Sequence, residues 1–130
     1  MFVHIDYSSS EPISHQVVAQ VKRLVVGGQL KSGDRLPSIR ELARQLKVNP
    51  TTITRIYGEL EHSGVITLRQ GRGAFVSQPA QLLPPQEVRR LVGRHAQAML
   101  VEGLRLGLEK EQIEQIVNEE YAKIRIPENE

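Results

Sequence analysis

Two short amphipathic segments lie close together in this sequence, separated by a break of about four residues. Ser38 and Glu41 have the spacing of a capping box, in which each side chain satisfies a backbone N–H group at a helix start. Asn49 and Pro50 favour the N-cap and the first helical position of the next segment. Apolar residues recur at helical spacing through both segments, at Ile39, Leu42, Ala43, Leu46, Ile53, Ile56 and Leu60. Two short helices joined so tightly are typical of a helix-turn-helix.

A basic β-hairpin is predicted directly after these two helices. Gly64 suits the left-handed position at which a helix ends, and residues 65–69 have the alternating, β-branched character of a strand. Residues 70–73, with the sequence Gln-Gly-Arg-Gly, are expected to form a turn, and residues 74–76 a returning strand. The hairpin therefore has a polar, positively charged tip.

A further helix is predicted upstream. Residues 8–12 signal a helix start, and apolar residues from Ile13 to Val25 recur at helical spacing. Residues 2–5 are a short apolar lead that could be a strand. Together with the hairpin, the three helices give an α+β fold: a winged helix-turn-helix domain over residues 1–78, with the hairpin as its wing.

The rest of the chain is predicted to be a helical tail. Residues 79–85 contain three prolines and are expected to be a linker, and two amphipathic helices fill residues 86–130, with a stop near Gly107. Two such helices cannot bury both apolar stripes on each other, so a second copy of the chain is the simplest partner. The alternative is a monomer whose tail folds back on the winged helix. The predicted dimer interface consists of Val88, Leu91, Val92, His95, Ala96, Met99, Leu100, Ile113, Ile116, Val117 and Tyr121.

Charge differs between the two halves of the chain. Residues 1–78 hold ten Lys or Arg and six Asp or Glu, whereas residues 79–130 hold seven and nine. A basic front half favours an anionic partner there. Ordinary scatter of surface charge is the alternative explanation.

Composition excludes several classes of protein. The chain has no cysteine, so disulfides and thiolate zinc sites are ruled out. No apolar run approaches the roughly 18 residues of a membrane span, and the N-terminus lacks the layout of a signal peptide, so a cytoplasmic protein without membrane contact is expected. The four histidines are scattered, and neither an enzyme nor a cofactor or metal site is predicted. Metal sensing through His95 is a minor alternative.

Candidate DNA-binding residues cluster in three places. Polar side chains at the start of the third helix can donate to phosphates or reach base edges, and the helix N-terminus itself favours a phosphate. An Arg between two glycines at the hairpin tip can enter a minor groove, and an Arg in the first turn of a helix suggests an external anion. The candidates are Arg35, Ser38, Arg40, Asn49, Thr51, Thr52, Thr54, Arg55, Tyr57, Gln70, Gly71 and Arg72.

Each cluster also has an ordinary structural explanation. Asn49 and the threonines could serve only as helix caps, and residues 70–73 could be a tight turn with a solvated Arg. Arg40 could be a surface residue. Tyr57 lies one residue off the apolar line of its helix, and it either packs at the edge of the core or presents its hydroxyl group to a phosphate.

A specific combination of motifs runs through residues 3–77. It comprises LPSIRELA at 36–43, VNPTT at 48–52, YGELE at 57–61, GVI at 64–66 and GRGAFV at 71–76. In combination these motifs resemble the GntR family of bacterial regulators. The Ile5-Asp6 and Pro12-Ile13 pairs, with a short helical tail, are similar to its YtrA subfamily.

The resemblance implies a dimeric transcription factor that binds an inverted-repeat operator in double-stranded DNA, usually as a repressor. It implies that Arg40 and the start of the third helix contact DNA and that the wing reaches the minor groove. Two positions depart from the family pattern. Gly58 stands where relatives often carry a stronger helix former, and glycine costs roughly 1 kcal/mol relative to alanine inside a helix. Thr54 stands where some relatives carry a basic residue.

Two questions stay open at the level of sequence. About 50 residues follow the winged helix, so a small-molecule effector would bind at the dimer interface or between the domains, and the sequence names no ligand. The alternative function is a winged helix that binds another protein without specific DNA binding. A polar helix start combined with a basic wing favours DNA.

Overall fold

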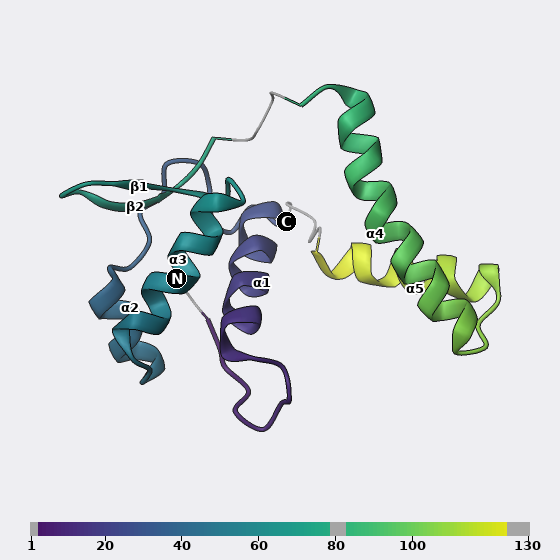
Figure 1. The fold of residues 1–130 in the computed structure, drawn as a ribbon, viewed down its shortest axis with the longest axis horizontal. Helices are drawn as coiled ribbons and strands as arrows, with labels where there is room; N and C mark the ends of the chain where they lie inside the picture. Colours follow the sequence, from purple (N-terminus) through teal and green to yellow (C-terminus); the bar gives the residue numbers. More distant parts are fainter. Residues whose placement is uncertain (1–2, 79–82, 125–130) are drawn as a thin grey trace. The chain divides into compact units, whose positions relative to one another are not determined.

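The computed structural model of the chain describes residues 3–78 and 83–124, and it divides into two compact units, residues 1–79 and 80–130 (Figure 1). The elements of the first unit are α1 (Ile13–Val26), α2 (Ile39–Leu46), α3 (Pro50–His62), β1 (Ile66–Arg69) and β2 (Gly73–Val76). The second unit contains α4 (Pro85–Arg105) and α5 (Lys110–Ile124). The α+β winged helix-turn-helix followed by a helical tail is therefore confirmed.

The helix starts follow the predicted caps. Ser38 Oγ accepts a hydrogen bond from the Glu41 N–H at 3.0 Å, and Glu41 Oε1 accepts one from the Ser38 N–H at 2.7 Å. Asn49 Oδ1 accepts from the Thr51 N–H at 2.8 Å, with Pro50 in the first turn of α3. Both helix starts are therefore capped by side chains. Between the two helices, Lys47 ends α2 in a left-handed conformation, with φ of 57°.

The core of the first unit lies where the three helices meet the hairpin. α3 packs against α1, α2 and β1, and its buried face is the predicted one, with Ile53, Ile56 and Leu60 fully covered. Apolar residues from the neighbouring elements complete this core, among them Val17, Val21, Leu36, Leu42, Leu46, Ile66, Ala74 and Val76. Since α3 lies at the centre of the core, its orientation is fixed by contacts on several sides.

The hairpin has a third, very short partner. β1 pairs antiparallel with β2, from Ile66 opposite Val76 to Arg69 opposite Gly73. On the other edge of β2, an isolated bridge joins Arg35 to Phe75, and the Leu36 N–H donates to the Ala74 carbonyl at 2.8 Å. The segment between α1 and α2 therefore joins the start of α2 to the wing.

The apolar lead at the N-terminus forms no strand in its described part, residues 3–5. Its backbone instead bonds to two side-chain amides of α1. Gln20 accepts from the His4 N–H and donates to the His4 carbonyl, and Gln16 does the same for Asp6. Because two amides one helical turn apart satisfy alternate residues of the extended chain, no strand partner is needed.

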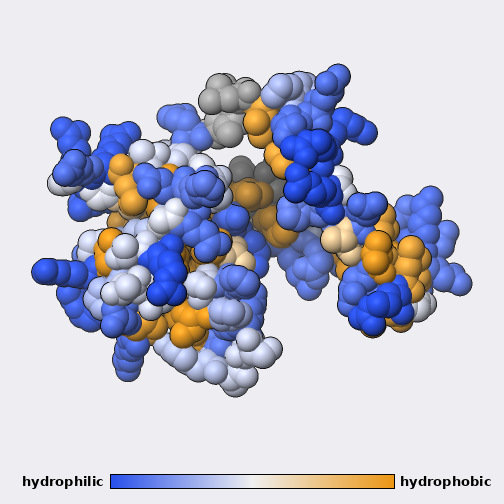
Figure 2. Space-filling view, viewed as in Figure 1, coloured by the Kyte–Doolittle hydropathy of each residue, from blue (hydrophilic) through white to orange (hydrophobic). Residues whose placement is uncertain are grey.

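The tail buries little of its apolar surface. α4 has no buried residue, and the single buried residue of α5 is Ile113. Figure 2 shows apolar side chains on the surface of these helices. Within the predicted interface, Ala96 is half-buried, and the other residues except Ile113 are exposed: Val88, Leu91, Val92, His95, Met99, Leu100, Ile116, Val117 and Tyr121.

Ile113 is the one residue of the predicted interface that is buried within its own chain. It is 5% exposed, and a methyl group placed on Gly103 would lie 2.8 Å from its Cδ1 atom. Ile113 therefore already packs against α4 of its own chain. Gly107 ends α4 with φ of 94°, as predicted. α4 begins at Pro85, one residue inside the predicted linker; linker residues 79–82 and tail residues 125–130 lie outside the described part of the chain.

Candidate nucleic-acid interface

The first turn of α3 presents short polar side chains. Asn49, Thr51 and Arg55 are exposed and Thr52 is half-buried. Asn49 uses its side-chain oxygen for the cap, which leaves its NH₂ group to donate outward. The Thr54 hydroxyl donates to the Pro50 carbonyl at 3.1 Å, so it cannot donate to a phosphate without breaking that bond. The helix therefore offers backbone N–H groups and several small polar groups to an anion or a base edge.

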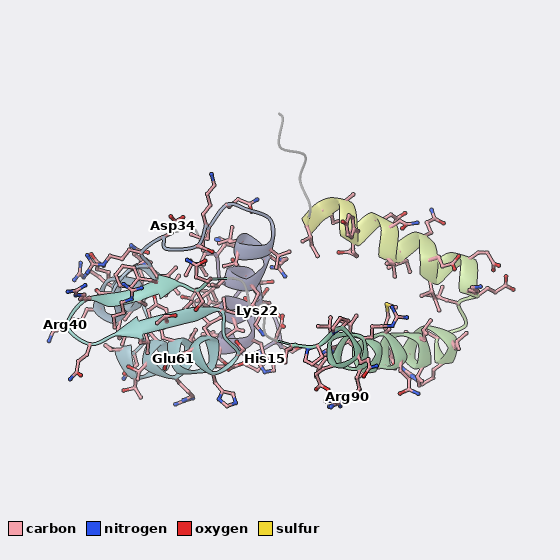
Figure 3. All side chains as sticks on the ribbon, turned by 90° about the horizontal axis from the view of Figure 1, so that it is seen from above. His15, Lys22, Asp34, Arg40, Glu61 and Arg90 are labelled. Atoms are coloured by element: carbon pink, nitrogen blue, oxygen red, sulfur yellow. The ribbon has the colours of Figure 1, made fainter. Side chains whose placement is uncertain are left out.

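The start of α2 presents two arginines. Arg40 and Arg35 are exposed, and Ser38 between them is half-buried and occupied by the capping box. Hydrogen bonds from Ser38 hold the pKa of the Glu41 carboxyl below its usual range, so Glu41 stays ionised as part of the cap. In Figure 3, Arg40 lies at the same end of the unit as the hairpin tip, away from His15 and Lys22 of α1. A helix start and the wing thus share one end of the molecule.

The wing carries its cations on a tight loop. The Arg72 N–H donates to the Arg69 carbonyl at 2.9 Å, and Gln70, Gly71 and Arg72 are all exposed. Gly71 has φ of 75° and Gly73 has φ of 113°, values that residues with side chains rarely adopt. The two glycines therefore fix the loop that projects Arg72 between them.

Arg69 is a basic residue of the wing that the sequence prediction missed. Its guanidinium carbon lies 5.1 Å from the centre of the Phe75 ring, within the range of a cation–π interaction. Position 69 was assigned to a strand and was not considered for binding. The sequence Arg-Gln-Gly-Arg-Gly at 69–73 could have indicated this residue. A turn of three residues places Arg69 opposite Gly73, and the Arg72 N–H donates to the Arg69 carbonyl.

A groove of about 330 Å³ runs between the start of α2 and the wing. Three arginines line it, Arg35, Arg69 and Arg72, and Tyr57 and Leu68 contribute to its apolar surface. Arg35 lies against the wing closely enough that a methyl group on Gly73 would be 3.2 Å from its Nε atom. The structure therefore brings the predicted Arg35, Ser38, Gln70, Gly71 and Arg72 together around one depression.

Tyr57 is part of the core of the first unit. It is 1% exposed, and its hydroxyl donates to the Pro37 carbonyl at 2.6 Å. Burial, with a smaller contribution from the Glu41 carboxylate, raises the pKa of the phenol well above its usual value. Of the two alternatives for this residue, the structure favours packing at the edge of the core, because the side chain is almost fully buried and only borders the groove.

The cations of the first unit form no close ion pair with the carboxylates described in the structure. Among the described residues, no Lys or Arg of 3–78 lies within ion-pair distance of a carboxylate. The ion pairs of the described residues lie in the tail, between Arg90 and Glu87, Arg105 and Glu102, Lys110 and Glu114, and Lys123 and Glu120. Around α2, Arg35 and Arg44 interact with the Glu41 carboxylate only at longer range.

The described parts of the chain offer neither a metal-binding cluster nor a membrane-spanning helix. No group of three or more His, Asp or Glu residues there could hold a metal ion, and the chain has no cysteine. No helix among those residues is both long and apolar enough to cross a membrane.

Similarity to known proteins agrees with this geometry. Residues 13–76 match the family described as bacterial regulatory proteins, gntR family. The chain is 32% identical over 123 residues to the HTH-type transcriptional repressor YtrA of Bacillus subtilis, a match that covers 95% of each chain. These relatives are DNA-binding regulators and not enzymes.

Solved structures extend the similarity to three dimensions. A transcriptional antiterminator from Listeria monocytogenes superposes with a TM-score of 0.83 at 29% identity, over 99% of this chain and 98% of that one. The structure of AraR(DBD) in complex with operator ORE1 matches with a TM-score of 0.50 at 25% identity, over 59% of this chain and 94% of that one. The matched family region covers α1, α2, α3 and the wing. The chain therefore belongs to the GntR family of bacterial regulatory proteins and is a YtrA-like transcriptional regulator.

Proposed function

We propose that the protein is a cytoplasmic repressor that binds an inverted-repeat operator as a homodimer and blocks a promoter sterically. In this proposal α3 enters the major groove with Asn49, Thr51, Thr52 and Arg55. Arg40 contacts DNA beside it, and Arg72 on the wing reaches the adjacent minor groove. Arg35 and Arg69 line the groove between the wing and α2, where a phosphate of the backbone would lie.

The observation that carries the proposal is the set of cations without carboxylate partners at one end of the first unit. An exposed cation gains little from a surface carboxylate, so unpaired arginines alone would say little. Here they lie beside a capped helix start and a glycine-flanked loop, both of which favour phosphates. The structural relative AraR(DBD) is in complex with operator ORE1, which supports DNA binding by the matched domain.

The homodimer is supported by the apolar face of the tail. α4 has no buried side chain in the single chain, so its contact with α5 leaves most of its apolar stripe uncovered. A second tail would cover both helices and would set two α3 helices on two half-sites related by two-fold symmetry. A small-molecule effector, if the protein has one, would bind where this interface forms.

The experiment that tests the proposal is selection of genomic DNA fragments by the purified protein, followed by footprinting at several salt concentrations. A protected inverted repeat near a promoter is the expected result, with log K falling linearly with log salt concentration. Binding without sequence preference, lost at physiological salt, would contradict the proposal and favour the protein-interaction alternative.

A further inference from the structure

The Tyr57 hydroxyl links the centre of α3 to the start of α2. It donates at 2.6 Å to the carbonyl of Pro37, the residue before the Ser38 cap. The phenol is 1% exposed and burial raises its pKa, so the hydroxyl keeps its proton and remains a donor to this carbonyl. The contact joins residues twenty positions apart in the chain.

The segment that receives this bond is also attached to the wing. The Leu36 N–H donates to the Ala74 carbonyl at 2.8 Å, and Arg35 forms the isolated bridge to Phe75. One hydroxyl group therefore lies at the point where α3, the start of α2 and β2 are joined. Each of these elements carries a different part of the proposed DNA contact: the polar start of α3, Arg40, and the wing with Arg72.

We infer that Tyr57 is a positioning residue for DNA binding: its bond to Pro37 fixes the spacing between α3, Arg40 and the wing. The inference rests on the proposed function, since it assigns a role within that interface. It does not place Tyr57 against DNA. Its prediction is that removing one buried hydroxyl group weakens operator binding although every residue at the DNA surface is unchanged.

A matched control exists in the same domain. The Tyr7 hydroxyl also donates at 2.6 Å to a backbone carbonyl of this helix pair, that of Leu46 at the far end of α2. Tyr7 is 66% exposed and lies outside α2 and α3, so Tyr7→Phe removes a bond of the same length without touching the contact between α3 and the start of α2. The two Tyr→Phe changes remove the same atom and the same kind of bond, but only Tyr57→Phe separates the start of α2 from α3.

The test compares operator affinity of Tyr57→Phe and Tyr7→Phe in the full chain, at a temperature at which circular dichroism shows both fully folded. We expect Tyr57→Phe to bind about tenfold more weakly, the size of one net hydrogen bond, and Tyr7→Phe to bind like the unaltered protein. Tyr57→4-aminophenylalanine, which keeps an N–H donor at the same place, is expected to restore binding. Unaltered binding by Tyr57→Phe, or a failure of that variant to fold at any temperature, would overturn the inference.

A double-mutant cycle separates positioning from a general loss of stability. If Tyr57 acts through Arg40, the effects of Tyr57→Phe and Arg40→Ala on affinity are less than additive. Full additivity would mean that Tyr57 does not act through Arg40 and would contradict the inference. Failure of the unaltered protein to bind any operator would contradict the proposed function. Normal operator binding by Tyr57→Phe would contradict only the inference about Tyr57.

Discussion

The two units of the chain leave opposite kinds of surface without a partner. In residues 3–78 the apolar side chains form one buried core, and the cations lack carboxylate partners. In residues 83–124 four cations form ion pairs with glutamates, namely Arg90, Arg105, Lys110 and Lys123. Most large apolar side chains there are exposed. The first unit thus buries its apolar side chains but leaves its cations without close ion pairs, and the second unit does the reverse. The comparison indicates that the first unit is built to bind an anion and the second to bind another apolar face.

Truncation after Gln78 tests this division with the largest expected effect. We expect a folded monomer, because the core of the first unit uses no residue of the tail. Its operator affinity should fall by roughly 10²- to 10⁴-fold, since the two half-sites are no longer held by one particle. Sedimentation and operator titration measure the two effects. A truncated protein that still sediments as a dimer would refute the role given to the tail.

Matched truncations of apolar side chains sharpen the comparison. Ile53 is fully buried and Leu100 is 40% exposed. Ile53→Ala should destabilise the first unit by about 2–5 kcal/mol, through loss of buried contacts and a new cavity, equally at every protein concentration. Leu100→Ala should lower stability in a concentration-dependent way, because it weakens association. Denaturation at two protein concentrations distinguishes the two variants. An unfolding midpoint of Leu100→Ala that does not change with protein concentration would argue against the dimer.

Single arginine changes should weaken DNA binding without affecting the dimer. Arg40→Ala and Arg72→Ala are each expected to cost about 1–3 kcal/mol of operator affinity. Each lost phosphate contact should also reduce the salt slope of log K by roughly one. Lys22→Ala, an exposed cation on α1, is the control and should leave binding unchanged. If both arginine variants bind normally, the assignment of the interface is wrong.

Two glycines give the smallest and most local comparison. Gly58 lies on the exposed side of α3, with no atom within 4 Å of an added methyl group, whereas a methyl on Gly103 of α4 would lie 2.8 Å from Ile113. Gly58→Ala should therefore stabilise the first unit by about 1 kcal/mol. Gly103→Ala should gain less or lose stability, because it displaces the one buried side chain of α5. Equal stabilisation by both changes, measured by thermal unfolding, would contradict the packing described for the tail.

Much of the first unit could be predicted because its local signals are strong. The capping box of Ser38 and Glu41, the Asn49 cap and the left-handed Gly64 define where helices begin and end, and all three are present in the structure. Helical spacing then identified the buried face of α3. These features depend on residues within one or two turns of each other, so they can be read from the sequence.

Long-range contacts could not be predicted in the same way. A single bridge between Arg35 and Phe75 leaves no periodic pattern, and the bond from Tyr57 to Pro37 depends on how α3 lies against α2. The N-terminal lead was wrongly given strand character, because the amides of Gln16 and Gln20 replace a strand partner. In the tail, the apolar pattern did not distinguish Ile113, which contacts its own chain, from its exposed neighbours.

Native mass spectrometry of the full chain with a duplex that carries its selected operator tests the central claim most directly. That claim is that the first unit recognises DNA and that the tail supplies the second copy. The account predicts two chains on each duplex, and a loss of this stoichiometry when the tail is removed. A single full-length chain bound specifically to each duplex would contradict it.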